Sequence, residues 1–89
     1  MIWKVDFDPQ AEKELDRIDH QHAKRILGFL HERIATESDP KRFGKPLGGD
    51  KHGLWRYRIG TYRIICQIQT ETIAVLVLRV GHRKDIYQK

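Results

Sequence analysis

Three arginines within eight residues are the part of this sequence best suited to chemistry. Arg56 and Arg58 stand two residues apart, and Arg63 follows beyond Gly60-Thr61. A two-residue connection with glycine first is typical of a β-hairpin turn, and it pairs Arg58 directly with Arg63 across two strands. Like charges in that position destabilise a sheet, and residues 54–69 contain no acidic residue to offset them. A guanidinium pair of this kind is suited to binding a phosphate or another anion.

A purely structural role is the alternative for these arginines. Their aliphatic stems can cover a sheet surface while the charged heads stay in water. An acidic residue from elsewhere in the chain, such as Asp50, could also pair with them. Alanine at Arg58 or Arg63 separates the two interpretations, because an anion site predicts weaker RNA binding with fold stability kept or raised.

Charge is segregated along the chain. The 89 residues carry a net charge of +5. Residues 1–40 hold six Lys or Arg against nine Asp or Glu, a net of −3, whereas residues 41–89 hold eleven against three, a net of +8. So basic a second half indicates a polyanionic partner, and a phosphate backbone is the commonest one. The alternative is that the basic residues only keep the domain soluble, but scattered charge would suit that role better than segregated charge.

Composition narrows the class of protein. The length suits one domain, residues 1–89, with a single modest core. Cys66 is the single cysteine, so an internal disulfide and a cysteine-based zinc site are excluded. No apolar stretch approaches the roughly 20 residues of a membrane helix, and the N-terminus lacks a signal-peptide layout, so we expect a cytoplasmic protein without a membrane role. No cofactor is indicated, and no metal-ligand spacing occurs among His20, His22, His31 and His52.

The elements that must hold the hairpin follow from hydrophobic spacing and turn residues. Residues 2–7 mix β-formers with rough alternation and predict a first strand. Asp8 suits the N-cap of a helix over about residues 9–19, which has proline at its first position. A second helix is predicted over about residues 20–36, because apolar residues recur there at helical spacing. It should end at residues 38–40, where a proline follows.

The second half predicts a loop and three strands. Residues 41–53 contain four glycines and four Lys or Arg, which indicates a structured surface loop that Leu47 anchors to the core. Strands are predicted over residues 54–59, 62–69 and 72–80, the last as a continuous apolar run typical of a central strand. The predicted fold is α+β: an N-terminal strand, a two-helix hairpin and a three-stranded antiparallel meander, with the helices on one face of the sheet.

Alternation assigns the two faces of the first hairpin strand. Side chains point to opposite faces at successive positions, so Trp55, Tyr57 and Ile59 share one face. Arg56 and Arg58 share the other. The apolar three should pack against the helices, and the arginines should therefore face away from them.

Two sequence blocks resemble a known family. WRYRIGTYRI at residues 55–64 and VGHRKDIY at residues 80–87, with KPL at residues 45–47, resemble the RelE/ParE superfamily of toxins from type II toxin–antitoxin systems, in its RelE-like mRNA interferase branch. The likeness spans nearly the whole chain, since length and element order also agree. It implies a cognate antitoxin as partner. It also implies metal-independent cleavage of mRNA in the ribosomal A site, in which the 2′-hydroxyl attacks the adjacent phosphate and leaves a cyclic phosphate and a free 5′-hydroxyl.

The resemblance also implies site residues, with one departure. RelE-like enzymes often carry lysine as a candidate base where this chain has Arg58, and a guanidinium does not deprotonate in a protein. Arg58 is therefore interpreted as a charge stabiliser, and His82 as a hypothetical acid or base, an ordinary turn histidine being the alternative. Tyr87 would stack on a splayed base, unless it only pins the C-terminus. The predicted catalytic residues are Arg58, Arg63, Arg83, Tyr87 and His82, and the predicted RNA-binding residues are Arg56, Lys51, Lys45 and Lys84.

Three functions compete at this point. The first is a ribosome-dependent mRNA endonuclease that inhibits translation. The second is a ParE-like toxin that inhibits DNA gyrase by protein contact, without catalysis. The third is a non-enzymatic RNA-binding module, whose affinity would fall with salt. The retained arginines and the C-terminal tyrosine favour the endonuclease, because gyrase-directed members usually lack the full set.

Overall fold

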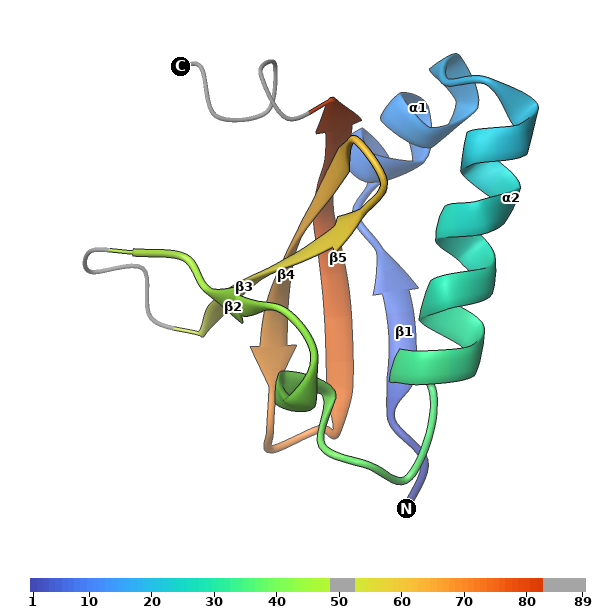
Figure 1. Cartoon of the computed structure of the whole chain (residues 1–89). Coiled ribbons are helices and arrows are strands. Elements are labelled where there is room, and N and C mark those ends of the chain that lie inside the picture. Colours follow the sequence, from blue (N-terminus) through green and yellow to red (C-terminus); the bar gives the residue numbers. More distant parts are fainter. Residues whose placement is uncertain (49–52, 83–89) are drawn as a thin grey trace.

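The computed structural model describes residues 1–48 and 53–82. These residues form an α+β fold in which both helices cover one face of a sheet (Figure 1), as predicted. The helical elements are α1 (Pro9–Arg17), α2 (His20–Phe29), a π-helical segment η1 (Leu30–Ile34) and a 3-10 turn η2 (Pro40–Arg42). The strands are β1 (Lys4–Phe7), β2 (Lys45–Pro46), β3 (Leu54–Ile59), β4 (Tyr62–Gln69) and β5 (Ala74–His82).

The five strands lie in the order β1-β5-β4-β3-β2. β1 runs parallel to β5, and the other neighbours are antiparallel. The predicted meander is confirmed, and β5 is internal to the sheet, between β1 and β4. The prediction of a loop over residues 41–53 was wrong for β2, which pairs with β3 in the register Lys45↔Arg56. Two exposed residues that include a proline carry no alternation, so this strand has no local signal.

Both helices begin at side-chain caps. The Asp8 carboxylate accepts a hydrogen bond from the Gln10 amide at 2.9 Å, and the Asp19 carboxylate accepts one from the Gln21 amide at 3.1 Å. These bonds satisfy amide donors that a helix N-terminus leaves free. The predicted second helix extends to residue 34, but its last turn is π-helical. Within residues 1–48 and 53–82, no helix is long and apolar enough to cross a membrane.

The core lies between the helices and one face of the sheet. It includes Tyr57 of β3 and Ile64 of β4, each fully buried, packed with residues of the helices such as Ile26. The Tyr57 hydroxyl donates a hydrogen bond to the Pro40 carbonyl at 2.9 Å, which ties η2 to this core. Cys66 is fully buried as well, and burial raises the pKa of its thiol. It is a core cysteine, consistent with its apolar sequence context.

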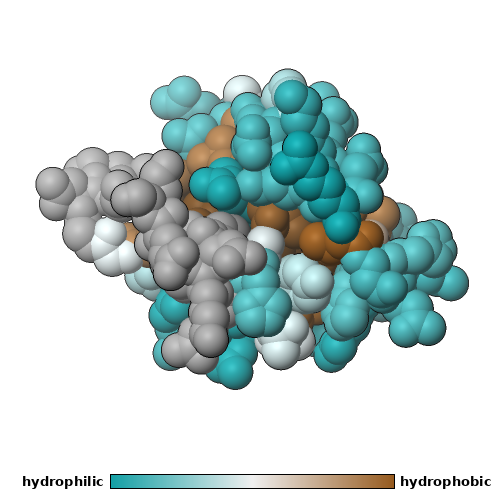
Figure 2. Space-filling view, turned by 90° about the horizontal axis from the view of Figure 1, so that it is seen from above, coloured by the Kyte–Doolittle hydropathy of each residue, from teal (hydrophilic) through white to brown (hydrophobic). Residues whose placement is uncertain are grey.

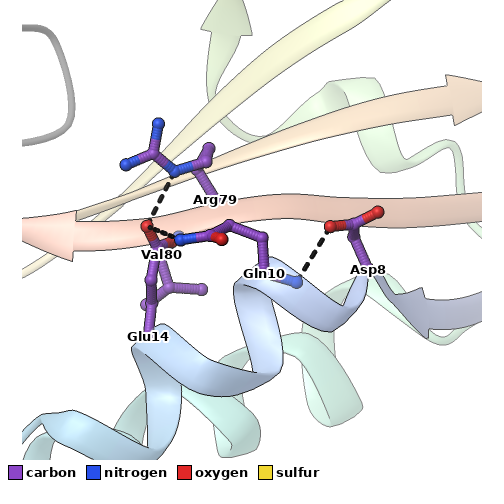
Figure 3. Close-up of polar contacts among 5 residues, drawn as sticks. All are labelled: Asp8, Gln10, Glu14, Arg79 and Val80. Carbon is purple, nitrogen blue, oxygen red and sulfur yellow. Dashed lines mark hydrogen bonds and ion pairs between the residues drawn. The ribbon is translucent and has the colours of Figure 1, made fainter. Parts of the chain in front are cut away.

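Beyond the end of β1, residues at the start of α1 and within it make the hydrogen bonds to the open edge of β5. The Asp8 amide donates to the Val77 carbonyl at 2.8 Å. Further along, the Glu14 carboxylate accepts from the Val80 amide at 2.7 Å and from Arg79 Nε at 2.8 Å (Figure 3). Gln10 supports it with a donor 3.2 Å from Glu14 Oε2. One largely buried carboxylate thus fixes the C-terminal part of β5, which borders the arginine hairpin.

Candidate anion-binding site

The β3–β4 hairpin has the register expected from its turn. Arg58 pairs with Arg63, Ile59 with Tyr62 and Arg56 with Ile65. Gly60 has φ +63°, and positive φ among the described non-glycine residues occurs only at Ile73, so the turn has positive φ at its first central residue alone. This is the type II′ pattern, for which glycine is favoured at that position.

The two faces of the hairpin differ as expected. Tyr57 and Ile59 belong to the core cluster, and Trp55 packs against it half-buried. Arg56 and Arg58 alternate with them and therefore lie on the face away from the helices. The arginine face of β3 is thus separate from the apolar core.

A pocket of about 200 Å³ opens on this face and is lined by Gly44, Lys45, Arg56, Arg58 and Arg63. Four of the five lining residues are cationic, and they come from three adjacent strands. Lys45 lies on β2, opposite Arg56 in the strand register. Such a concentration of donors and positive charge favours an anion. We call this cavity the cationic pocket.

Arg63 is the buried charge of the site. It is 4% exposed and is the one buried charged residue in the part of the chain that the structure describes, whereas Arg58 is exposed. Among residues 1–48 and 53–82, no carboxylate lies within 4.0 Å of the Arg58 or Arg63 side chain. Burying a charge is costly unless it is paired or hydrogen-bonded. No side-chain nitrogen of the described residues is buried without a partner, so the Arg63 guanidinium must reach the cationic pocket, where an anion would pair with it.

Close backbone packing at Gly44 positions β2. Gly44 has φ +75°, and a Cβ there would overlap the Arg56 carbonyl oxygen and lie 2.8 Å from the Tyr57 ring. Only glycine fits this approach without strain. The neighbouring segment is fixed by Trp55, whose indole Nε1 donates to the Phe43 carbonyl at 2.7 Å. The wall that carries Lys45 is therefore built into the fold.

A second glycine shapes the other side of the site. Gly81 of β5 pairs with Arg63, so the rung of the sheet formed by Arg58, Arg63 and Gly81 has no side chain at its β5 end. The next rung on the same face of the sheet contains Lys45, Arg56, Ile65 and Arg79. Sequence reasoning missed both glycines. The β4–β5 register shifts between Ile65 and Cys66, so counting along the strands would not have placed Gly81, and nothing local marks Gly44.

His82 lies on the other face of the sheet. It pairs with Tyr62, whose other cross-strand partner is the buried Ile59. Ring centroids of Tyr62 and His82 are 5.8 Å apart, and those of Tyr62 and His22 are 5.1 Å apart. The three rings form an aromatic cluster between α2 and the sheet. Seen from above, this end of the molecule is mostly hydrophilic, with apolar surface near its middle (Figure 2).

The structure thus brings together part of the predicted site. Lys45, Arg56, Arg58 and Arg63 line one cavity, whereas His82 does not contribute to it. The remaining predicted residues lie outside the described residues, namely Lys51, Arg83, Lys84 and Tyr87. Asp50, the suggested partner of the arginines, lies outside them too. Among the described residues, no cluster of three His, Cys, Asp or Glu side chains could hold a metal ion.

Comparison with known proteins gives a consistent family. The model of the ParE toxin of the type II toxin–antitoxin system parDE matches residues 5–87. Toxin RelG of Mycobacterium tuberculosis is 34% identical to the chain over 89 residues, which is 100% of both sequences. Toxin RelE of the same organism is 28% identical over 78 residues, covering 88% of this chain and 78% of the relative.

Solved structures agree with these sequence matches. The toxin–antitoxin complex RelBE2 from Mycobacterium tuberculosis contains a chain that superposes with a TM-score of 0.83 at 30% identity, covering 96% of this chain and 95% of that one. The archaeal RelE–RelB complex from Pyrococcus horikoshii matches with a TM-score of 0.76 at 26% identity, covering 96% and 99%. The likeness therefore extends over nearly the whole of each molecule.

Proposed function

Because this chain belongs to the ParE toxin family of type II toxin–antitoxin systems and is a toxin of its RelE/RelG group, we propose that it inhibits translation by cutting messenger RNA in the ribosomal A site. The observation that carries the proposal is the cationic pocket, in which the buried Arg63 stands beside Arg58. A phosphodiester is the anion that such a reaction would place there.

The proposed reaction transfers a phosphoryl group within the RNA. The 2′-oxygen forms a bond to the adjacent phosphorus, and the bond from phosphorus to the 5′-oxygen of the next nucleotide breaks. One proton leaves the 2′-hydroxyl and one reaches the departing 5′-oxygen, so the products are a cyclic phosphate and a free 5′-hydroxyl. Reactions of this type depend mainly on positioning and on positive charge around the phosphate oxygens.

The cationic pocket can supply that charge. Arg63 is buried and fixed between strands, so it suits a non-bridging oxygen that must be held in one place. Arg58 and Arg56 line the same cavity and would contribute further guanidinium donors. Since guanidiniums keep their protons, these residues would stabilise charge and would not transfer protons.

The family resemblance assigns roles in the proposed reaction to four further residues, which lie outside the described ranges. Arg83 would stabilise the leaving 5′-oxygen, and Tyr87 would stack on a base of the message. Lys51 and Lys84 would hold the RNA backbone. His82 is not given a role in the reaction, because its ring lies against Tyr62 on the opposite face from the cationic pocket.

A cognate antitoxin is the proposed protein partner. Two of the similar structures are described as toxin–antitoxin or RelE–RelB complexes, and RelB would correspond to the antitoxin here. An acidic segment laid over Arg58 and Arg63 would neutralise their charge and occlude the cationic pocket. Such a partner would therefore block RNA and stabilise the fold together.

The experiment adds the purified protein to ribosomes programmed with a defined message and maps the cut sites. Cleavage with a cyclic phosphate end is expected, and none when the nucleotide before the cut carries a 2′-deoxyribose. Arg63→Ala should abolish cutting, while Lys13→Ala on the exposed surface of α1 should not. Supercoiling by gyrase is assayed in parallel. Intact message with inhibited gyrase would overturn the proposal in favour of a gyrase inhibitor, and RNA binding without cuts in favour of a binding module.

A further inference from the structure

The reaction proposed above needs a proton acceptor, and three of the four cations in the cationic pocket cannot serve. Arg56, Arg58 and Arg63 carry guanidiniums, which do not lose a proton in proteins. The fourth is Lys45, whose amine can become neutral and accept a proton. We propose that Lys45 is the general base that takes the proton from the attacking 2′-hydroxyl. This inference rests on the proposed function and adds a catalytic residue to it.

The strand order places Lys45 suitably for that role. β3 lies between β2 and β4, so Lys45 and Arg63 line the cationic pocket from the two sides of β3. A phosphate held by Arg63 and Arg58 would therefore have the Lys45 amine on the β2 side. The register Lys45↔Arg56 puts both side chains on the pocket face of the sheet.

The backbone of Lys45 is held firmly although its side chain is exposed. On one side, Gly44 packs against the Arg56 carbonyl so closely that no Cβ would fit. On the other, the Leu47 amide donates to the Leu54 carbonyl at 3.1 Å. These contacts fix the backbone, so the position of the amine varies only with the rotamers of the four-carbon side chain. A base anchored in this way can stay near a bound ribose without being part of the core.

The alternative is that Lys45 is only one more phosphate-binding cation. That role requires positive charge, which arginine would preserve. A general base instead requires a neutral nitrogen, which arginine cannot provide. The substitution Lys45→Arg therefore separates the two, because it keeps the charge of the cationic pocket and removes the exchangeable proton.

The proton balance of this step predicts how the cleavage rate depends on pH. The neutral amine takes the 2′-hydroxyl proton as the 2′-oxygen bonds to phosphorus, and water protonates the departing 5′-oxygen. The ammonium then returns its proton to solvent, so one proton has moved from one oxygen to the other. Below the pKa of an amine, the neutral fraction rises tenfold per pH unit, so a base of this kind gives a rate that rises with pH.

The test measures single-turnover cleavage on programmed ribosomes across a range of pH. For the wild-type protein, the logarithm of the rate should rise with pH with a slope near one. Lys45→Arg should lower the rate about 10²- to 10⁴-fold and remove the slope, with ribosome affinity retained. Lys41→Arg is the matched control. Lys41 lies in η2 with its amine over the Trp55 ring at 5.7 Å and does not line the cationic pocket, so its rate and slope should be unchanged.

Chemical rescue makes the test sharper. Lys45→Cys followed by aminoethylation restores an amine at this position, and buried Cys66 should not react in the folded protein. Recovery of cleavage is expected, with the rate profile moved to lower pH because sulfur in the chain lowers the basicity of the amine. An equally active Lys45→Arg protein with the wild-type slope would overturn this inference alone. Absence of cleavage by the wild-type protein would overturn the proposed function and this inference with it.

Discussion

Arg58 and Arg63 are direct cross-strand partners in the β3–β4 ladder, and Arg63 is 4% exposed. Two like charges face each other at the cationic pocket, and no carboxylate among the described residues pairs with either. Such a pair opposes folding. An anionic substrate bound between the two arginines would relieve this repulsion, which gives the pair a functional explanation.

Removing Arg58 should therefore leave the fold no weaker and the activity much lower. Arg58→Ala should raise the free energy of unfolding by about 0.2 to 1 kcal/mol, because the repulsion with Arg63 is lost. Cleavage should fall about 10²- to 10³-fold through lost charge stabilisation. Urea denaturation and cleavage on ribosomes measure the two effects. Cooperative destabilisation by this substitution would show that the arginine pair is structural.

Gly44→Ala should damage the fold and the site together. The added Cβ would overlap the Arg56 carbonyl, and φ +75° is unfavourable for alanine, so we expect a loss of about 1 to 3 kcal/mol in unfolding free energy. Displacement of β2 should also reduce cleavage. Gly28→Ala is the control, because nothing lies within 4 Å of its Cβ position in α2. That substitution should stabilise by about 0.5 to 1 kcal/mol, and equal effects at both glycines would contradict the packing argument.

The Glu14 side chain should contribute more to the free energy of unfolding than an ordinary surface carboxylate does. Glu14→Ala leaves the Val80 amide and the Arg79 guanidinium without their acceptor, at a cost of about 2 to 3 kcal/mol in unfolding free energy. Glu14→Gln keeps one neutral acceptor, so its unfolding free energy should fall by less than that of Glu14→Ala. Thermal and urea unfolding of both variants would be compared with Glu12→Ala, an exposed acid in the same helix. A Glu14→Ala protein as stable as the control would disprove this role.

His82→Gln should retain cleavage within about twofold of the wild-type rate, because the ring packs against Tyr62 on the face opposite the cationic pocket. Single-turnover rates across the pH range would show this directly. A large loss, accompanied by a changed pH profile, would restore the hypothesis that His82 transfers a proton.

Cys66 should be unreactive in the folded protein. The thiolate is the reactive form, and burial raises the pKa of this thiol, so little thiolate exists at neutral or mildly alkaline pH. Labelling with a thiol reagent should be slow in buffer and fast in denaturant. Rapid labelling of the native protein would show that the core around β4 opens readily.

The hairpin register could be predicted because it depends on local chemistry. Gly60 sets the turn, and a two-residue connection leaves one register, so the pairing of Arg58 with Arg63 follows by counting. The burial of Arg63 could not be predicted in the same way. Nor could β2, a strand of two residues that approaches β3 closely at Gly44, because that contact has no signature in neighbouring residues.

The position of His82 shows how a small error in a strand boundary changes a functional argument. The last strand was predicted to end at residue 80, which left His82 in a turn beside the arginines. The strand continues through His82, and the register with β4 shifts between Ile65 and Cys66. Pairing with Tyr62 then places the histidine on the face of the sheet that the helices cover. An irregularity of this kind reverses the facing of every later side chain, and periodicity alone does not locate it.

The Glu14 carboxylate has a consequence for association with other chains. A strand edge with unpaired amides is a template on which another strand can add, and proteins guard such edges against aggregation. Where β1 ends, the Val80 amide of β5 would be open to that addition, and Glu14 occupies it with an acceptor that belongs to a helix. A strand supplied by a second molecule would have to displace Glu14 to pair with β5 at this position. The same carboxylate that fixes β5 thus also limits how the toxin can assemble.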